Sequence, residues 1–283
     1  MKFISTLIAL ALISTHSLAN DLAEAMSYYE QRDYSNAVEK LEKIRSNEAE
    51  TLFPLAVSQF RTGEYKAADK TVEKLISLSP TDGDAYYLKG LIQMGLLNEV
   101  SMFRKLGVAK AALAAWEKSV EVQPDHVTGA YAVFSFLVNA PGMAGGDLER
   151  AKTMLPEIMA LSPTYGEMAK GVLAAKEEKA EVALAHFVKA TSTAGEDAGP
   201  WFGAAQFYMQ NNEPAKALEA LAQYRQLPKR WNDPVDANVL LLQGRALALQ
   251  GNKGEARNSL EQALSLAGND RTRDFIEDEL DKL

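Results

Sequence analysis

One pattern recurs through most of the chain and restricts it to pairs of packed helices. Each copy has a small residue, a second small residue further on, and a bulky apolar residue four positions after the second. The first small residues are Ala25, Ala56, Gly90, Ala132, Gly171, Ala205 and Gly244, the second are Ala37, Ala68, Ala112, Ala151, Ala183, Ala217 and Ala256, and the bulky residues are Leu41, Val72, Trp116, Leu155, Phe187, Leu221 and Leu260. Residues four apart lie on one face of a helix. Because small residues let two helices approach closely while bulky residues fill the space beside them, the pattern predicts a repeated helix-turn-helix unit.

The spacing of these units, together with the residues at fixed positions, indicates the kind of repeat. The second small residues follow one another at intervals of 31, 44, 39, 32, 34 and 39 residues. The stretch AGPWFGAAQFYMQNNEPAKALEALAQY, Ala198–Tyr224, resembles a tetratricopeptide repeat, a helix-turn-helix unit of about 34 residues. It has aromatic residues at Trp201 and Tyr208 and small residues at Ala205 and Ala217, where that family has them. The resemblance covers nearly all of the chain after its N-terminal segment, and it implies a platform rather than a particular reaction.

The fold implied by this resemblance is all-α. It is a right-handed α-solenoid of about seven tetratricopeptide-like repeats, closed by a C-terminal capping helix. We expect a single domain over residues 20–283, with repeats over 20–47, 48–81, 82–125, 126–164, 165–197, 198–232 and 233–268 and the capping helix over 269–283. Asn269 or Asp270 can cap this last helix, and its apolar face comprises Phe275, Ile276, Leu280 and Leu283.

The N-terminus is typical of an export signal that is removed. Lys2 precedes an apolar run, and Ser17-Leu18-Ala19 supplies small residues for cleavage after Ala19. The run is too short for a stable transmembrane anchor, and a buried N-terminal helix is the alternative interpretation. The chain has no cysteine, which excludes a lipid-modified cysteine, disulfides and thiolate ligands. We therefore expect a signal peptide over residues 1–19 and a periplasmic or secreted protein.

The balance of charges bears on the kind of partner. Lys and Arg total 30 and Asp and Glu total 38, which gives a formal net charge of −8. Nucleic-acid binding depends on clustered Lys and Arg, so nucleic acid is not an expected partner. No apolar stretch after the signal reaches transmembrane length, and we expect no integral membrane segment once the signal is removed.

Two of the units contain extra residues. In the third unit the segment LLNEVSMFRKLGVAK, residues 96–110, has helical spacing of its apolar residues and is expected to lengthen both helices and the turn between them. In the fourth unit the segment NAPGMAGG, residues 139–146, separates the two helices. This segment and the preceding SMFRKLGVAKAALAAWEKSV resemble a bacterial subgroup of these repeat proteins that has no firmly assigned activity.

The glycine-rich segment raises the question of a phosphate-binding loop. Such a loop follows a strand, and a lysine and a hydroxyl residue come directly after its glycines. Here a helix precedes the segment, and the acidic Asp147 takes the first of those positions. We therefore interpret the segment as a connector in which Gly142, Gly145 and Gly146 take backbone angles closed to other residues and Asp147 caps the next helix. A rim that contacts a partner through Met143 is the alternative.

No arrangement of residues indicates catalysis or a bound cofactor. The histidines after the signal, His126 and His186, lie in different repeats, whereas metal sites need convergent ligands. We therefore expect no catalytic residue, no metal site and no cofactor. The segment LPKRWNDP is expected to be an exposed connection whose tryptophan tucks into the helix stack. Its alternative is a contact site at Lys229, Arg230 and Trp231, because exposed Trp and Arg favour interfaces.

The register of the repeat family places side chains of each first helix in the concave groove. Relatives that bind a C-terminal carboxylate use Lys, Arg and Asn there, whereas only Gln206 and Arg245 are polar in this chain. The expected groove residues are Phe53, Val57, Phe60, Tyr87, Leu91, Met94, Val133, Phe136, Met168, Val172, Phe202, Gln206, Met209, Leu241 and Arg245. Aromatic and methionine side chains make an adaptable apolar trough, and we expect it to hold an apolar or amphipathic segment, in particular a helix. In the alternative, the long helices of the third unit or the C-terminal helix fill the trough.

The sequence thus predicts a non-catalytic scaffold or adaptor in the bacterial cell envelope that binds another protein or a peptide through an apolar groove. An enzyme or small-molecule binder that uses the same groove is the first alternative. A structural subunit that contacts only its own copies is the second, and homo-oligomerisation is compatible with all three. Two titratable groups that converge in a pocket favour an enzyme, whereas a continuous apolar trough favours peptide binding.

Overall fold

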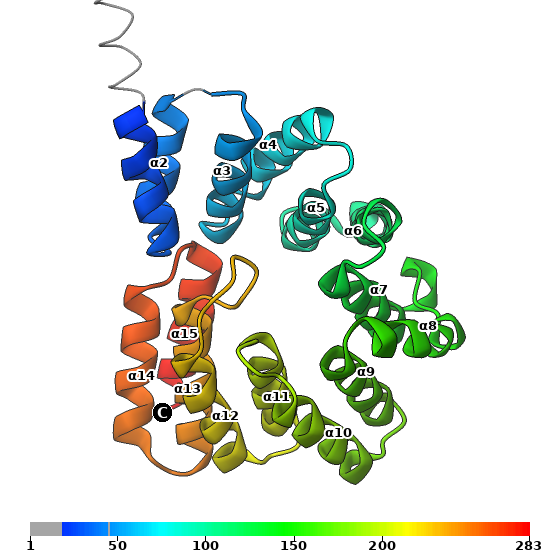
Figure 1. Ribbon diagram of the computed structural model, residues 1–283. Helices are drawn as coiled ribbons and strands as arrows, with labels where there is room; N and C mark the ends of the chain where they lie inside the picture. Colours follow the sequence, from blue (N-terminus) through cyan, green and yellow to red (C-terminus); the bar gives the residue numbers. More distant parts are fainter. Residues whose placement is uncertain (1–18, 45) are drawn as a thin grey trace, which may run out of the picture.

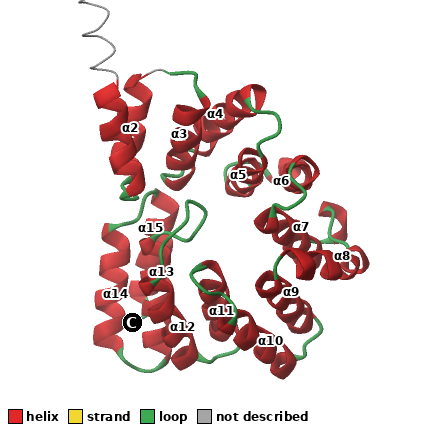
Figure 2. Ribbon diagram, in the orientation of Figure 1, coloured by secondary structure: helices red, strands yellow, loops and turns green. Residues whose placement is uncertain are grey.

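The structure, a computed structural model, describes residues 19–44 and 46–283. Every regular element in these two ranges is a helix, as Figure 2 shows. The all-α class predicted from the repeats is therefore correct. The predicted signal peptide, residues 1–19, lies outside the described residues except for Ala19.

The helices follow one another with short connections. Residues 19–30 are helical and pack against α2 through Ala25, Ala37 and Leu41. The further elements are α2 (Tyr34–Ile44), α3 (Ala49–Arg61), α4 (Tyr65–Leu78), α5 (Gly83–Leu96), α6 (Met102–Val122), α7 (Val127–Asn139), the short 3-10 helix η1 (Gly142–Ala144), α8 (Leu148–Leu161), α9 (Pro163–Lys176), α10 (Ala180–Ser192), α11 (Gly199–Gln210), α12 (Pro214–Gln226), α13 (Asp236–Leu249), α14 (Lys253–Ser265) and α15 (Asp270–Asp281).

Consecutive helices form hairpin pairs, and the pairs stack side by side (Figure 1). The pair made by residues 19–30 and α2 is followed by α3–α4, α5–α6, α7–α8, α9–α10, α11–α12 and α13–α14. Each pair also packs on the next one, and α15 covers α14 at the end. This is the architecture of a solenoid, in which each repeat buries its apolar face against its neighbours.

The recurring small residues lie where the two helices of a pair touch. A Cβ atom on Gly90 would come within 2.2 Å of Trp116 Nε1, and this indole nitrogen donates a hydrogen bond to the Tyr87 carbonyl at 3.2 Å. A larger residue at position 90 cannot fit unless α6 moves. The fourth unit differs, because Ala130 is buried whereas Ala132 is partly exposed. The choice of Ala132 as the small contact residue of that unit is therefore wrong.

The solenoid curls until its two ends meet and the molecule becomes a closed ring (Figure 1). The connection between α12 and α13 reaches the N-terminal repeats, where two arginines bind its backbone carbonyls. Arg32 Nη2 donates to the carbonyls of Asp233 (2.6 Å) and Pro234 (3.0 Å). Arg61 Nη2 donates to those of Trp231 (2.6 Å) and Asp233 (2.8 Å). These bonds join residues about 170 to 200 positions apart in the chain, and they were not predicted from the sequence.

A second contact closes the ring at the turn between α14 and α15. A Cβ atom on Gly268 would lie 2.9 Å from the Arg61 carbonyl oxygen, and one on Gly63 would lie 2.6 Å from Asn269 Cβ. Gly63 also has a φ of +82°, a left-handed conformation that favours glycine. The two ends of the solenoid therefore touch at two separate places, backbone close to backbone.

The extra residues of the third unit lengthen only one of its helices. α5 has 14 residues, the same as α4, whereas α6 has 21. The expectation that both helices are longer is therefore wrong for α5. The inserted residues form the turn after Leu96 and the first two turns of α6.

The glycine-rich segment joins α7 to α8 through η1, as the connector interpretation requires. Asp147 accepts a hydrogen bond from the Arg150 amide at 2.9 Å and caps α8. Only Gly145 needs a left-handed conformation, with φ at +108°. A Cβ atom on Gly146 would lie 1.9 Å from the Ala140 carbonyl oxygen, so this glycine is required by space and not by its backbone angles. Nothing lies within 4 Å of a Cβ on Gly142, and neither reason applies there.

The capping helix α15 is placed as predicted. Asn269, and not Asp270, is its cap and accepts a hydrogen bond from the Thr272 amide at 2.9 Å. Ile276 is fully buried against the α13–α14 pair, whereas Phe275 is 44% exposed. A polar outer face on a terminal helix shields the last apolar layer of a solenoid from water.

Candidate functional site

The closed ring contains an apolar cavity of about 670 Å³. Its walls come from α5, α6, α7, α9, α11 and the connection between α12 and α13. The lining includes Tyr87, Leu91, Met94, Trp116, Thr128, Tyr131, Ala132, Ser135, Phe136, Asn139, Tyr165, Met168, Gly199, Phe202, Gly203, Gln206, Asn232, Asp233 and Pro234. Clefts of this size that combine apolar walls with a few polar groups are typical ligand sites.

Several of the groove residues predicted from the sequence converge on this cavity. They are Tyr87, Leu91, Met94, Phe136, Met168, Phe202 and Gln206. They come from four successive repeats, which is the arrangement that a concave solenoid surface produces. That they contact a partner stays a prediction.

The assignment of two residues to the groove is wrong. Val57 and Val133 are 0% and 2% exposed and pack inside the helix layers instead of facing the groove. A side chain one position along a helix is turned by about 100°, so a small error of register moves it from the groove into the core. Phe136 lines the cavity but is itself only 8% exposed, so it also supports the core.

The loop that closes the ring covers two of the predicted groove residues near the N-terminus, Phe53 and Tyr87. The Trp231 ring lies edge-on to Phe53, with centroids 5.2 Å apart, and edge-on to Tyr87, at 5.8 Å. Phe60 packs against Tyr65 with centroids 6.0 Å apart. At Phe53 and Tyr87 the predicted trough is thus filled from within, by the loop between α12 and α13 and not by α5 or α6, whereas Leu91 and Met94 line the cavity.

At the other end, the groove positions are covered by the capping helix. Leu241 packs in the same cluster as Ile276. Arg245 Nε lies 3.5 Å from Glu279 Oε2, and its guanidinium lies over the Phe275 ring at 6.0 Å. The alternative that the C-terminal helix fills the trough is therefore correct for this last repeat.

The two remaining groove positions do not line the main cavity. Met209 is half-buried against the core that contains Phe207 and Tyr208. Val172 lines a smaller hollow of about 480 Å³, which shares Ser135 and Gln206 with the main cavity. This hollow extends the cavity between α7, α9 and α11.

The segment LPKRWNDP is a loop held by contacts with the rest of the chain. Trp231 is tucked against the N-terminal repeats, as the structural interpretation predicted. Lys229 Nζ donates to the Tyr224 carbonyl at 2.6 Å and lies over the Tyr224 ring at 4.4 Å. Arg230 is exposed, and its Nη1 lies 3.1 Å from Asp197 Oδ2. Met143, the other predicted rim residue, is 74% exposed beside the cavity wall formed by its neighbours in η1.

The polar groups of the cavity are mostly uncharged. Burial raises the pKa of Tyr87 and of Tyr131 to about 12, so both phenols stay neutral near pH 7. Asp233 is 5% exposed, and its Oδ2 accepts a hydrogen bond from the Arg230 amide at 2.6 Å. Burial raises the pKa of this carboxyl as well. No lysine or arginine is among the residues that line the cavity, so the site suits an apolar occupant without a negative charge.

Several residues that line the cavity were missed in the prediction from sequence. Thr128, Tyr131, Ser135 and Asn139 follow one another at helical spacing and form one face of α7. This spacing could have indicated the face. The assignment of Ala132 as the packing residue, however, placed this face of α7 toward its partner helix instead of toward the groove. The loop residues Asn232 to Pro234 carry no such signal, because they reach the cavity only through the closure of the ring.

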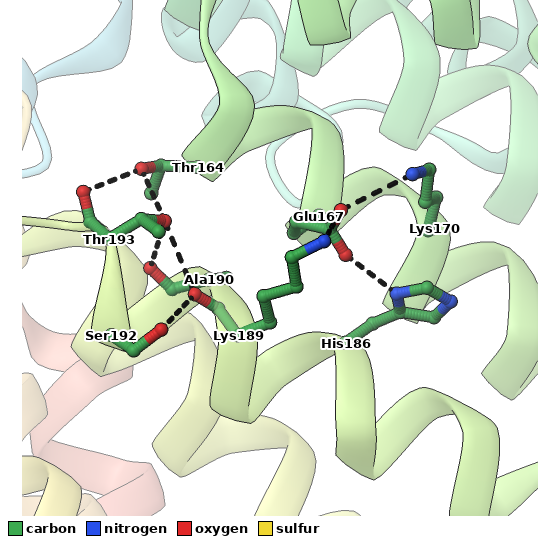
Figure 3. A network of polar contacts seen from close by, with 8 residues as sticks. All are labelled: Thr164, Glu167, Lys170, His186, Lys189, Ala190, Ser192 and Thr193. Atoms are coloured by element: carbon green, nitrogen blue, oxygen red, sulfur yellow. Dashed lines mark hydrogen bonds and ion pairs between the residues drawn. The ribbon is translucent and has the colours of Figure 1, made fainter.

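A second polar cluster joins α9 to α10 and is shown in Figure 3. Glu167 is buried, and its carboxylate lies 2.7 Å from His186 Nδ1, 3.0 Å from Lys189 Nζ and 3.2 Å from Lys170 Nζ. Burial alone would raise the pKa of Glu167, but the hydrogen bonds from these three groups outweigh it and lower the pKa to about 2. In the same view the Thr164 hydroxyl meets the Thr193 carbonyl at 2.9 Å. The cluster ties two helices of one repeat together.

His126 and His186 both make contacts within the fold. His186 is at the edge of the core, with its side chain 29% exposed, and belongs to the Glu167 cluster. His126 caps α7, because its Nδ1 accepts a hydrogen bond from the Gly129 amide at 2.9 Å, and its Nε2 lies 3.2 Å from Asp84 Oδ1. Over residues 19–44 and 46–283, no group of three potential metal ligands comes together.

Comparison with known proteins identifies the architecture. A family model described as tetratricopeptide repeat matches residues 218–271. A tetratricopeptide repeat protein from Parabacteroides merdae has a similar crystal structure, with a TM-score of 0.53 and 15% identity, over 94% of this chain and 98% of that one. A thermophilic tetratricopeptide repeat protein from Thermus thermophilus aligns with a TM-score of 0.54 and 19% identity, over 68% of this chain and 99% of that one.

No curated protein sequence matches the chain. At such low identities the structural neighbours carry information on the fold alone. The fold they share is the solenoid of helix pairs described above, and the residues matched by the family model include most of α12, the loop that closes the ring, α13 and α14. The stacked helix pairs and these matches together show that the chain has the tetratricopeptide repeat fold, with residues 218–271 matching the family model itself.

Proposed function

We propose that the protein is a non-catalytic scaffold of the bacterial cell envelope that binds an apolar segment of another protein in the cavity of its ring. The tetratricopeptide repeat fold is in general a scaffold for protein interaction, which supports the first part. The observation that carries the proposal is the convergence of aromatic and methionine side chains from four repeats on one cavity that is open to solvent. Such side chains adapt to apolar partners of different shapes.

The size of the cavity restricts the occupant. The cavity of about 670 Å³ is open to solvent on one side, so a helix laid along the groove, as expected from the sequence, would place only one of its faces in the cavity. The cavity accepts a few bulky side chains from a short segment or from one face of a helix.

The envelope location rests on the predicted signal peptide. Lys2, the apolar run and Ser17-Leu18-Ala19 are the features that support it. Among the described residues, no helix has both the length and the apolar character that a membrane crossing demands. N-terminal sequencing of the protein from fractionated cells tests this part, and a cytoplasmic product that retains Met1 would contradict it.

A small apolar molecule is a second candidate occupant. The cavity volume lies within the range of about 300–1,000 Å³ that is usual for small-molecule sites. The absence of lysine and arginine from the lining favours an uncharged compound over an anionic one. In this alternative the protein carries or stores the compound and does not transform it.

A photoreactive amino acid at position 135 tests the proposal in living cells. Ser135 lines the cavity, whereas Ala185 is exposed on α10 and serves as the control position. We expect position 135 to capture a protein segment that position 185 does not, and a synthetic peptide of that segment to bind the purified protein. Ala132→Phe, which adds a ring to the cavity wall, should abolish both results, and Ala185→Phe should leave them unchanged.

Two other outcomes decide between the candidates. A compound of a few hundred daltons that remains bound in native mass spectrometry, and is lost in Ala132→Phe, would favour the small molecule. Equal capture at positions 135 and 185 would contradict a role for the cavity.

A further inference from the structure

The N-terminal end of α6 projects beyond the helix with which it is paired. Trp116 lies opposite Gly90 in this pair. From that point α5 continues for only six residues, to Leu96, whereas α6 extends back for fourteen residues, to Met102. At a rise of 1.5 Å per residue, the difference of eight residues makes an overhang of about 12 Å. We call residues 102–109 the α6 overhang.

The α6 overhang exposes large apolar side chains. Phe103 is 96% exposed, Met102 75% and Leu106 39%, and Phe103 has the highest exposure among the large hydrophobic residues of the described chain. At 100° per residue these three side chains fall within an arc of about 100° on the helix. On the opposite side of the overhang Val108 packs on the ring, and Ala109, about one turn after Leu106, is buried at the base of the overhang. The exposed stripe therefore contributes nothing to the core.

Cations flank this apolar stripe. Arg104, Lys105 and Lys110 lie on the overhang and on the turn that follows it, and no acidic residue occurs between Glu99 and Glu117. Those two glutamates are engaged elsewhere: Glu99 lies 2.8 Å from Lys66 Nζ, and Glu117 lies 2.6 Å from Arg150 Nη1. In a chain with a net charge of −8 this segment is a local cationic site.

We propose that the α6 overhang docks the protein on an anionic lipid bilayer, with Phe103, Met102 and Leu106 inserted between the headgroups and the three cations bound to lipid phosphates. An apolar helix face flanked by Lys and Arg is the pattern that binds in the plane of a membrane interface. The inference rests on this surface alone and goes beyond the occupant of the cavity.

The observations favour a bilayer over a protein partner. Three side chains of this kind present at most about 500 Å², whereas stable protein interfaces bury about 800 Å² on each partner. The stripe lies on the part of α6 that extends about 12 Å beyond the end of α5, and its side chains are exposed there. The negative charge of the remainder of the molecule disfavours any other orientation on an anionic membrane.

Docking would bring the cavity close to the membrane. Ala109, at the base of the overhang, lines the cavity together with Leu97 from the preceding turn. The overhang thus forms part of the rim through which an apolar occupant reaches the ring.

The absence of cysteine from the sequence permits a site-specific test. Phe103→Cys carries an environment-sensitive fluorophore such as NBD, and Phe275→Cys, at a second exposed phenylalanine on α15, is the matched control. The full chain is mixed with vesicles of phosphatidylglycerol and phosphatidylethanolamine at a ratio of 1:3, or with phosphatidylcholine vesicles. We expect a blue shift at position 103 on the anionic vesicles and quenching there by nitroxide-labelled lipids, with neither at position 275. The fluorophore reports only on its own surroundings. Binding through another part of the chain would therefore not produce a blue shift at position 103.

Charge variants complete the test. Replacement of Arg104, Lys105 and Lys110 by Gln should weaken the vesicle binding seen at position 103 by about 100-fold, since each cation contributes about fivefold. Replacement of the exposed Arg225 and Arg257, which lie on α12 and α14, by Gln is the control. It should change the vesicle binding measured at position 103 by less than twofold. No blue shift at position 103, or an equal shift at both probes, would overturn the proposal. So would a shift caused by an acidic amphipathic peptide but not by vesicles, which would identify a protein partner.

Discussion

Substitution of Glu167 by Gln tests the electrostatic account of the α9–α10 pair. The carboxylate is buried and meets three donors, His186, Lys189 and Lys170, at 2.7 to 3.2 Å. Gln keeps the shape of the side chain but removes its charge. The three donors then face one another without a counter-charge, and the amide NH₂ group cannot accept hydrogen bonds from them. The variant should therefore be less stable than the wild type near neutral pH.

The magnitude follows from the pKa of Glu167. The pKa of about 2 in the folded state, against the ordinary glutamate pKa of 4.5, corresponds to about 3.4 kcal/mol of stabilisation at about 1.36 kcal/mol for each step of one in pKa. The pKa is lower in the folded state, so this stabilisation is complete above about pH 4.5 and is lost as the pH falls toward 2. At pH 3 about 1.4 kcal/mol of it should remain.

Urea denaturation followed by circular dichroism at pH 7 and pH 3 measures both values. We expect Glu167→Gln to lower the free energy of unfolding by about 3 kcal/mol at pH 7 and by about 1 kcal/mol at pH 3. Glu157→Gln, at an exposed glutamate of α8, should change it by less than about 0.5 kcal/mol at either pH. A loss that is equal at both pH values would refute the argument, because it would show that the ionisation of Glu167 does not stabilise the fold.

Three further predictions concern the connector, the ring and the cavity. Gly146→Ala should destabilise the protein by about 1–3 kcal/mol, because the new methyl group meets the Ala140 carbonyl oxygen; Gly142→Ala should be nearly neutral, and equal melting temperatures would contradict this interpretation. Trp231→Ala should lower the free energy of unfolding by about 2–3 kcal/mol and open the ring. Small-angle X-ray scattering would then record a larger radius of gyration. An unchanged radius would mean that the arginine hydrogen bonds suffice to close the ring. Phe202→Ala should weaken capture at the cavity at least tenfold while the melting temperature changes by only a few degrees; a large fall in melting temperature with capture intact would assign this ring to the core.

Much of the fold could be predicted from the sequence because it depends on contacts between neighbouring helices. Gly90 and Trp116 face each other within one hairpin, and such pairs recur at a spacing that can be read directly. The cap of α8 at Asp147 is more local still, since its acceptor and donor are three residues apart. The fold class, the capping helix and the connector were predictable for this reason.

The candidate site was predictable only in part. Tyr87, Met168 and Phe202 line the cavity as expected, because the repeat register sets which face of a helix looks inward. Where that register was misjudged by a residue or two, in α7, Val133 was assigned to the groove in place of Tyr131. A helix turns by about 100° per residue, so an error this small exchanges core and surface.

By itself, the sequence determined the helix pairs, their stacking and the apolar character of the inner face. Only the tertiary structure decided that the solenoid closes into a ring, with Arg32 and Arg61 bound to carbonyls some 170 to 200 residues away and Trp231 seated on Phe53. The physical reason is that curvature accumulates over the whole stack. A small rotation at each repeat interface sets the distance between the ends, and no local pattern of residues encodes that sum. The ring turns an open groove into a cavity of about 670 Å³ and so restricts the size of what it can bind.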